Sequence, residues 1–298
     1  MSKNTIFTGA AVALATPMHQ DGAINYEALG ALIDFQIENG TDALLICGTT
    51  GEASTMTDEE QIDCVRYSVQ RAAGRVPVIA GAGSNNTSHA IDLARGCAEA
   101  GADATLQVSP YYNKTSQAGL VRHFTAIADA VDLPIILYNI PGRTGVNIAP
   151  ETCRILADHP GIVGVKEASG NLSQVATLAQ LCGDVLDIYS GNDDQILPVL
   201  SLGGKGVISV LSNVLPRQTH DMCQFFFDGR FQESLALQLG LLPLIHALFS
   251  DVNPIPVKEA LNLMGKNAGP CRMPLIEMQE GPKARLAEVL REAGVSLA

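Results

Sequence analysis

The segment IVGVKEASG at Ile162–Gly170 decides the fold. It opens with an unbroken apolar run, Ile162–Val165, and the run ends at Lys166. Short apolar runs without polar alternation are typical of strands that are buried on both faces in a parallel sheet. The segment therefore predicts an inner strand of an α/β protein, with a lysine at the carboxyl end of that strand.

Similar apolar runs recur about every 25–30 residues along the chain. The full set is Gly9–Ala15, Ala43–Cys47, Val76–Ala80, Ala104–Val108, Ile135–Tyr138, Ile162–Val165, Leu186–Tyr189 and Gly206–Val210. Segments with helical spacing lie between them, among them Tyr26–Glu38, Asp58–Arg71 and Thr87–Ala100, and Asp58 is the expected N-cap of the second. Eight strands that alternate with helices predict a βα repeat, and the count favours a closed (β/α)8 TIM barrel over an open sheet.

The pattern changes after Val210. Helical spacing continues in three stretches, from about Pro216 to Phe249, from Pro254 to Met264 and from Pro282 to Ala293. A barrel needs about 250 residues, so the 298 residues fit one barrel and a tail. We expect a barrel catalytic domain at 1–228 and a C-terminal helical domain at 229–298.

Composition excludes several classes of function. The net charge is 19 − 31 = −12, which disfavours nucleic-acid binding, and no apolar run is long enough to cross a membrane. The seven cysteines are scattered, without a CxxC pair or a Cys/His cluster, which predicts no metal site and a reducing cytoplasm. The apolar stretch Phe7–Ala15 is also compatible with a signal peptide, but we favour a first barrel strand because only Lys3 precedes it as a positive charge.

Catalytic groups of such barrels lie at the carboxyl ends of the strands, where Lys166 is expected. Burial disfavours the charged ammonium and lowers the pKa of the lysine, and a neutral amine can attack a ketone to form an imine. The alternative is a structural lysine that reaches solvent and pairs with Glu167.

The residues that follow the fifth and second runs carry further candidate groups. Tyr138 can relay protons, and Arg143 can bind a carboxylate with two hydrogen bonds. The turn Gly48–Glu52 offers hydroxyls and amides that could hold a carboxylate. For each of these the alternative is a polar residue at the rim of the barrel without a catalytic role.

The residues at two more strand ends have several possible roles. Tyr111 and Tyr112 follow the fourth run and could stack, donate protons or contact another subunit. Asp193 and Asp194 follow the seventh run, where a helix N-cap is favoured over a metal site. Gly81-Ala82-Gly83 lacks the third glycine of a dinucleotide-binding motif.

Taken together, the strand ends resemble the dihydrodipicolinate synthase / N-acetylneuraminate lyase family of class I aldolases, from Gly9 to about Pro274. The motifs that carry the resemblance are GTTGE at Gly48–Glu52, PYYNK at Pro110–Lys114, LYNIPGRTG at Leu137–Gly145, GVKEASGN at Gly164–Asn171, GGKGVISV at Gly203–Val210 and NPIPVK at Asn253–Lys258. The resemblance implies a TIM barrel with a C-terminal helical domain, assembled as a homotetramer or a dimer.

The resemblance also implies roles for individual residues. Lys166 would form a Schiff base with pyruvate, so that no separate cofactor is needed. Tyr138 would be the central proton relay, and Thr49 would pass protons between Tyr138 and Tyr112. In tetrameric members one tyrosine of the pair Tyr111 and Tyr112 crosses a subunit interface, and the sequence leaves open which one does.

Three further positions would bind the first substrate. Thr50 and its neighbouring amides would hold the pyruvate carboxylate. Gly191 and Ile208 would line the site through their backbone groups.

Arg143 separates the activities within the family, because synthase members use an arginine here to bind the carboxylate of aspartate semialdehyde. The resemblance thus implies condensation of pyruvate with aspartate semialdehyde to 4-hydroxy-tetrahydrodipicolinate, on the route to lysine and diaminopimelate. The alternatives are an aldolase or lyase for another 2-keto acid, such as a sugar acid, and a non-catalytic barrel.

One group of positions departs from lysine-inhibited members. Their allosteric pocket carries His and Glu side chains where this chain has Asp58, Gln61 and His89, whereas Asn85 and Tyr111 are kept. The loss of a glutamate at His89 removes a partner for a lysine ammonium, which predicts weak or absent inhibition by lysine.

Overall fold

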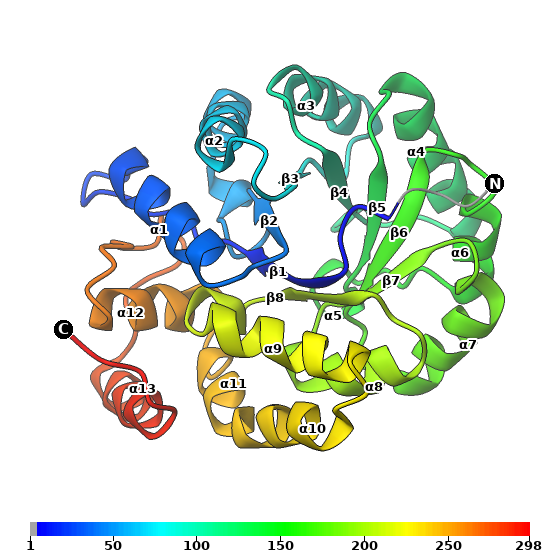
Figure 1. Ribbon diagram of the computed structural model, residues 1–298. Helices are drawn as coiled ribbons and strands as arrows, with labels where there is room; N and C mark the ends of the chain where they lie inside the picture. The colour runs from blue at the N-terminus through cyan, green and yellow to red at the C-terminus, as the bar shows by residue number, and fades with distance from the viewer. Residues whose placement is uncertain (1–4) are drawn as a thin grey trace.

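The computed structural model describes residues 5–298 and contains a closed parallel barrel, in which each strand pairs with the next and β1 pairs with β8 (Figure 1). The strands are β1 Gly9–Ala13, β2 Ala43–Ile46, β3 Val78–Gly81, β4 Ala104–Val108, β5 Ile135–Asn139, β6 Ile162–Glu167, β7 Asp187–Ser190 and β8 Gly206–Ser209. The predicted TIM barrel is therefore confirmed. Every strand lies within two residues of the apolar run that predicted it.

The strand register brings the expected catalytic residues together. Lys166 on β6 lies opposite Tyr138 on β5 and opposite Tyr189 on β7. All strands are parallel, so their carboxyl ends meet at one rim of the barrel. The barrel interior is a compact apolar cluster that includes Ile208 and Leu45.

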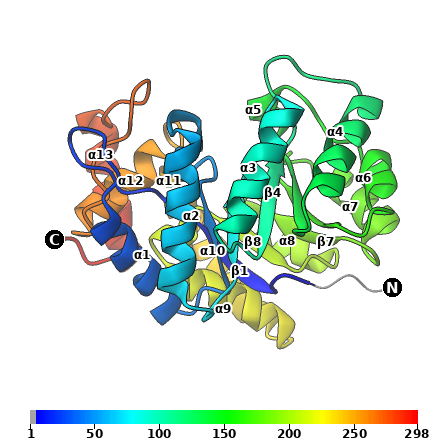
Figure 2. The ribbon, with the colours of Figure 1, turned by 90° about the horizontal axis from the view of Figure 1, so that it is seen from above.

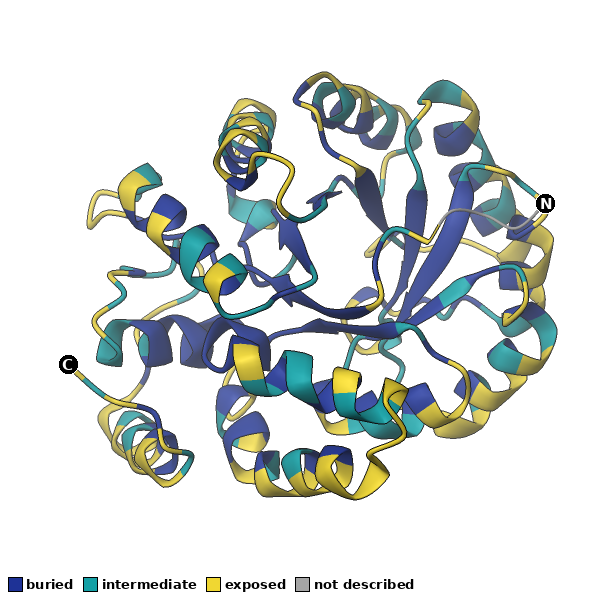
Figure 3. Ribbon diagram, viewed as in Figure 1, coloured by how far each residue is buried: buried dark blue, intermediate teal, exposed yellow. Residues whose placement is uncertain are grey.

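Helices surround the barrel and bury their apolar faces against it, while their outer faces remain exposed (Figure 3). The barrel helices are α1 Tyr26–Glu38, α2 Asp58–Ala72, α3 Thr87–Glu99, α4 Gln117–Ala130, α5 Pro141–Thr144, α6 Pro150–Leu156, α7 Leu172–Cys182, α8 Ile196–Ser201 and α9 Pro216–Phe227. Three short 3-10 helices, η1 Ala53–Thr55, η2 Asp193–Gln195 and η3 Leu211–Asn213, lie in the rim loops.

The start of α2 differs from the prediction. Thr57, not Asp58, is the N-cap: its hydroxyl accepts from the Glu60 amide, and the Glu60 carboxylate accepts from the Thr57 amide. This capping box satisfies two amides at once, and it leaves the carboxylate of Asp58 free to pair elsewhere.

The C-terminal helices are α10 Phe231–Gly240, α11 Leu242–Leu248, α12 Ile255–Leu263 and α13 Glu280–Glu292. Two views show α12 and α13 on the same side of the molecule as α1 (Figures 1 and 2). Many of their buried residues share one apolar cluster with residues of β8 and α9. The division into 1–228 and 229–298 remains a prediction. Between residues 5 and 298 no helix has the length and apolar character needed to cross a membrane.

Candidate active site

Lys166 points into the barrel from the end of β6 and is buried, with 5% of its surface exposed. Its amine nitrogen, Nζ, lies 4.5 Å from the centre of the Tyr138 ring. Desolvation is the largest influence on the amine, and it lowers the pKa of Lys166 from 10.5 to about 8. The lysine therefore has a sizeable neutral fraction near neutral pH, as a nucleophilic amine requires.

Glu167 is not the partner of Lys166, so the ion pair that was expected for a structural lysine does not form. Neighbouring residues of a strand point to opposite faces, and the Glu167 carboxylate accepts instead from the Asn139 side chain at 2.9 Å and the Ser169 amide at 2.7 Å. Among residues 5–298 no ion pair involves the Lys166 amine. The amine is left available for a substrate.

The negative charge of Asp193 acts on Lys166 and raises the pKa of the lysine against the effect of desolvation. Its carboxylate oxygen Oδ2 accepts from the amides of Val210 and Leu211 at 3.0 and 2.9 Å. The expected helix N-cap role is thus wrong, because the carboxylate bonds to the loop after β8 rather than to its own helix. Within residues 5–298 no three metal-binding side chains are grouped to hold a metal ion.

The rate of imine formation is expected to rise with pH and to level off above a midpoint near 8, the pKa of Lys166. The neutral amine is the reactive form, and about one lysine in ten is neutral at pH 7 with this pKa. Trapping with pyruvate and cyanoborohydride across the pH range measures the midpoint. A rate that still climbs beyond pH 10 would show an ordinary exposed lysine.

Asp193→Asn provides the matched control for this pH profile. The substitution removes the charge that favours the ammonium, so the midpoint is expected to move to lower pH.

Tyr138 ends β5 beside the lysine, and its phenol is buried. Burial raises the pKa of Tyr138 to about 12, while the positive charge of Arg143 and a hydrogen bond with the Thr49 side chain act in the opposite direction. The phenol thus stays protonated at neutral pH and can donate a proton, and Thr49 gives it a partner with which to exchange one.

The turn Gly48–Glu52, which we call the threonine turn, follows β2 and carries both threonines of the site. The buried Thr50 hydroxyl accepts from the side-chain amide of Asn253 at 3.0 Å. Because that contact uses an oxygen lone pair, the Thr50 proton remains free for another acceptor. The Arg143 guanidinium donates to the backbone carbonyl oxygen of the same Asn253 at 3.3 Å.

A cavity of about 360 Å³ opens above these groups. Its lining includes Thr49, Tyr138, Arg143, Asp58 and His89. Lys166 is not part of the lining, but its amine lies 4.5 Å from the centre of the Tyr138 ring. Tyr138 therefore contacts both the cavity and the amine.

The two rim tyrosines occupy different places. Tyr111 lines the cavity, whereas Tyr112 is 91% exposed and is not part of the cavity lining. Tyr112 adopts a left-handed backbone conformation, with φ of 67°. The structure of one chain therefore does not bring Tyr112 to Thr49 and Tyr138.

Gly191 lies against the lysine side chain, and Ile208 lies in the apolar cluster of the barrel interior. A β-carbon at Gly191 would lie 3.2 Å from the Lys166 side chain and 2.6 Å from that of Ala168, so only glycine fits there. Ile208 is fully buried within the barrel cluster.

The sequence did not indicate the contacts that Asn253 and Asp193 make in the site. Asn253 opens the NPIPVK motif and contacts Thr50 and Arg143, although it lies about two hundred positions away from Thr50. Asp193 was assigned to a helix cap. Asn253 could have been noticed as a polar residue just before an apolar helix. Nothing in the sequence indicates which residue it contacts.

A comparison with family models matches residues 6–293 to the dihydrodipicolinate synthetase family. The chain is also similar to the 4-hydroxy-tetrahydrodipicolinate synthase of Lachnoclostridium phytofermentans, with 57% identity over 97% of this chain and 99% of the relative.

Solved structures agree with this comparison. A chloride-inhibited dihydrodipicolinate synthase from Acinetobacter baumannii, complexed with pyruvate, is 40% identical with a TM-score of 0.96 over 98% of this chain and 100% of the other. The enzyme of Cyanidioschyzon merolae with lysine bound is 42% identical with a TM-score of 0.95 over the same shares.

Proposed function

We propose, from the premise that this chain belongs to the dihydrodipicolinate synthetase family, that it is a 4-hydroxy-tetrahydrodipicolinate synthase that joins pyruvate to aspartate semialdehyde through an imine at Lys166. The observation that carries the proposal is a buried lysine with a lowered pKa beside a buried phenol. The relative that was solved with pyruvate supports the choice of the first substrate.

In the first half of the reaction, the neutral Lys166 amine attacks the keto carbon of pyruvate and water leaves, which forms the imine. Thr50 and the amides of the threonine turn hold the pyruvate carboxylate. Tyr138 gives a proton to the departing oxygen, and Thr49 exchanges a proton with Tyr138. Loss of a methyl proton then converts the imine to an enamine.

In the second half, the enamine carbon attacks the aldehyde carbon of the second substrate and forms the new carbon–carbon bond. Arg143 holds the carboxylate of that substrate at the mouth of the cavity. The amino group of the substrate then replaces Lys166 at the imine carbon, which closes the ring and frees the lysine.

An aldolase or lyase for a sugar acid would share the Lys166 chemistry but would need hydroxyl-binding groups at the mouth. A non-catalytic barrel would need no lysine with a lowered pKa in its interior. Assays with pyruvate plus aspartate semialdehyde, run beside sugar-acid substrates, separate the three functions.

Arg143→Ala is expected to raise the KM for aspartate semialdehyde by about 10²-fold, while imine formation with pyruvate stays intact. The loss corresponds to one charge-assisted pair of hydrogen bonds, about 3 kcal/mol. Steady-state product formation, with the concentration of each substrate varied in turn, measures the KM for each substrate separately. An equal effect on the KM for both substrates would contradict the assignment of Arg143 to the acceptor.

We further propose that Tyr112 completes the site of a second copy of the chain, in a homotetramer or a dimer. Its exposure supports this, because a tyrosine that is 91% exposed and outside the lining of its own cavity is available for contact with a neighbouring subunit. A chain that remained monomeric and fully active at assay concentrations would argue against it.

Lysine is expected to inhibit this chain weakly or not at all. One ring nitrogen of His89, Nε2, lies 2.8 and 3.0 Å from the Asp58 carboxylate oxygens, and the other lies 3.0 Å from the Ser84 hydroxyl. The carboxylate at this end of the cavity is therefore already paired and offers little to a lysine ammonium. Activity titrated with lysine tests the expectation, and sub-millimolar inhibition would contradict it. His89→Glu, which adds a carboxylate, is expected to increase sensitivity.

We also propose a cytoplasmic location. Cys47, Cys64, Cys97, Cys153 and Cys223 are free, buried thiols, which fits a reducing compartment.

A further inference from the structure

A fully buried ion pair joins the C-terminal helix α12 to the threonine turn. The ammonium of Lys258 lies 2.7 Å from the Glu52 carboxylate, and the two side chains are 2% and 1% exposed. Lys258 also donates to the Pro270 carbonyl at 2.5 Å. Burial of two charges costs free energy of desolvation unless all of their hydrogen-bond donors and acceptors have partners. General packing therefore does not explain why this pair is buried.

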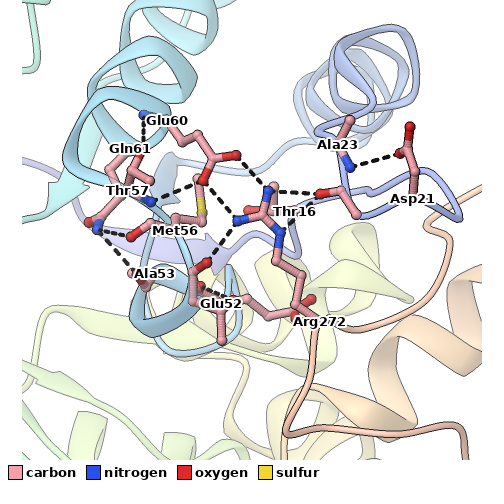
Figure 4. A network of polar contacts seen from close by, with 12 residues as sticks. Thr16, Asp21, Ala23, Glu52, Ala53, Met56, Thr57, Glu60, Gln61 and Arg272 are labelled. Carbon is pink, nitrogen blue, oxygen red and sulfur yellow. Dashed lines mark hydrogen bonds and ion pairs between the residues drawn. The ribbon is translucent and has the colours of Figure 1, made fainter.

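The second oxygen of Glu52 is bound as well. It accepts from the Arg272 backbone amide at 2.8 Å, and the Arg272 side chain in turn pairs with Glu60 and donates to the Gly22 and Thr55 carbonyls (Figure 4). The C-terminal loop that carries Arg272 is thus tied both to the threonine turn and to the start of α2.

Glu52 is held in a conformation that its residue type does not favour. Its φ is +58°, in the left-handed region, where glycine is the usual residue. Its amide closes the turn by donating to the Thr49 carbonyl at 3.1 Å. The residue before it, Gly51, accepts from the Thr16 hydroxyl at 2.7 Å. A glutamate at this point is explained by its carboxylate, which Lys258 and Arg272 bind.

The segment that leads into α12 contacts the turn at a second point. Asn253 lies five positions before Lys258 and donates to the Thr50 hydroxyl. The Lys258 and Asn253 contacts therefore hold the turn on both sides of Gly51, which restricts the position of Thr50.

We propose that Lys258 and Glu52 are positioning residues for pyruvate: their buried ion pair fixes the threonine turn so that Thr50 is placed to bind the substrate carboxylate. The inference rests on the proposed function. Neither residue touches substrate, and both act through Thr50.

The test uses Lys258→Met, Glu52→Gln and the double variant in the full-length protein. Each keeps the approximate shape of the side chain while removing a charge. The double variant leaves no unpaired buried charge, so it serves if a single variant does not fold. The pyruvate concentration that gives half-maximal borohydride trapping is expected to rise about tenfold or more in each variant. The KM for aspartate semialdehyde is expected to change much less.

The matched control is Glu259→Gln with Lys283→Met. This pair lies on the same C-terminal helices with a nitrogen–oxygen distance of 2.7 Å, but it is partly exposed and does not contact the turn. Its trapping curve is expected to match wild type.

The outcomes are separable. Folded Lys258 and Glu52 variants whose trapping curves match wild type would overturn the positioning role, and so would an equal loss in the control pair. Failure of the wild type itself to trap pyruvate would overturn the proposed function, and this inference with it.

Discussion

Lys166→Met is expected to lower product formation by at least about 10⁴-fold, because among residues 5–298 the amine of Lys166 is the only one that lies over the Tyr138 ring to form the imine. The substitution keeps the unbranched stem and removes a group whose charge is disfavoured by burial, so the fold is expected to persist or to gain stability. Steady-state product formation from the two substrates measures the loss, and a melting curve shows that the variant is folded.

Lys205→Met is the control for that substitution. Lys205 lies directly before β8, at the amino end of the barrel strands and away from the rim where the site lies. Its activity is expected to match wild type. Activity of the Lys166 variant near the wild-type level would exclude imine catalysis at this residue.

Tyr138→Phe is expected to lower kcat by about 10²–10⁴-fold, the usual range for loss of a positioned acid or base. The ring keeps its packing in the barrel cluster, but the hydrogen bond with Thr49 and the phenolic proton are lost. Stopped-flow and steady-state measurements are expected to show slower imine formation, with the amine still open to trapping at long times. A kcat close to wild type would show that protons move by another route.

The strands could be predicted from the sequence because a strand that is buried on both faces requires an unbroken apolar run, as at Ile162–Val165. Their ends shifted by a residue or two where a polar side chain continues the strand, as Lys166 and Glu167 do in β6. The helix start at Thr57 was predictable in principle, since Thr57 and Glu60 have the spacing of a capping box. Asp58, one residue later, is an equally good cap by residue type alone.

The contacts between distant segments could not be predicted. Asn253 meets Thr50, and Lys258 meets Glu52, only because the C-terminal segment folds back onto the rim of the barrel. Tyr112 has a left-handed backbone conformation that its residue type does not indicate. The roles of the candidate site residues remain proposals. Thr49, Tyr138 and Arg143 line one cavity, Lys166 lies beside the Tyr138 ring, Thr50 and Arg143 share the partner Asn253, and Gly191 lies against the Lys166 side chain. For Ile208 the support is its burial in the barrel cluster with Tyr138.

Imine formation at Lys166 is tested most directly by locating the residue to which pyruvate becomes covalently attached. The protein is incubated with pyruvate, reduced with borohydride, digested and mapped by mass spectrometry. We expect one reduced pyruvate per chain, on the peptide that contains Lys166. An adduct on another lysine, or no adduct on folded protein, would contradict imine formation at Lys166.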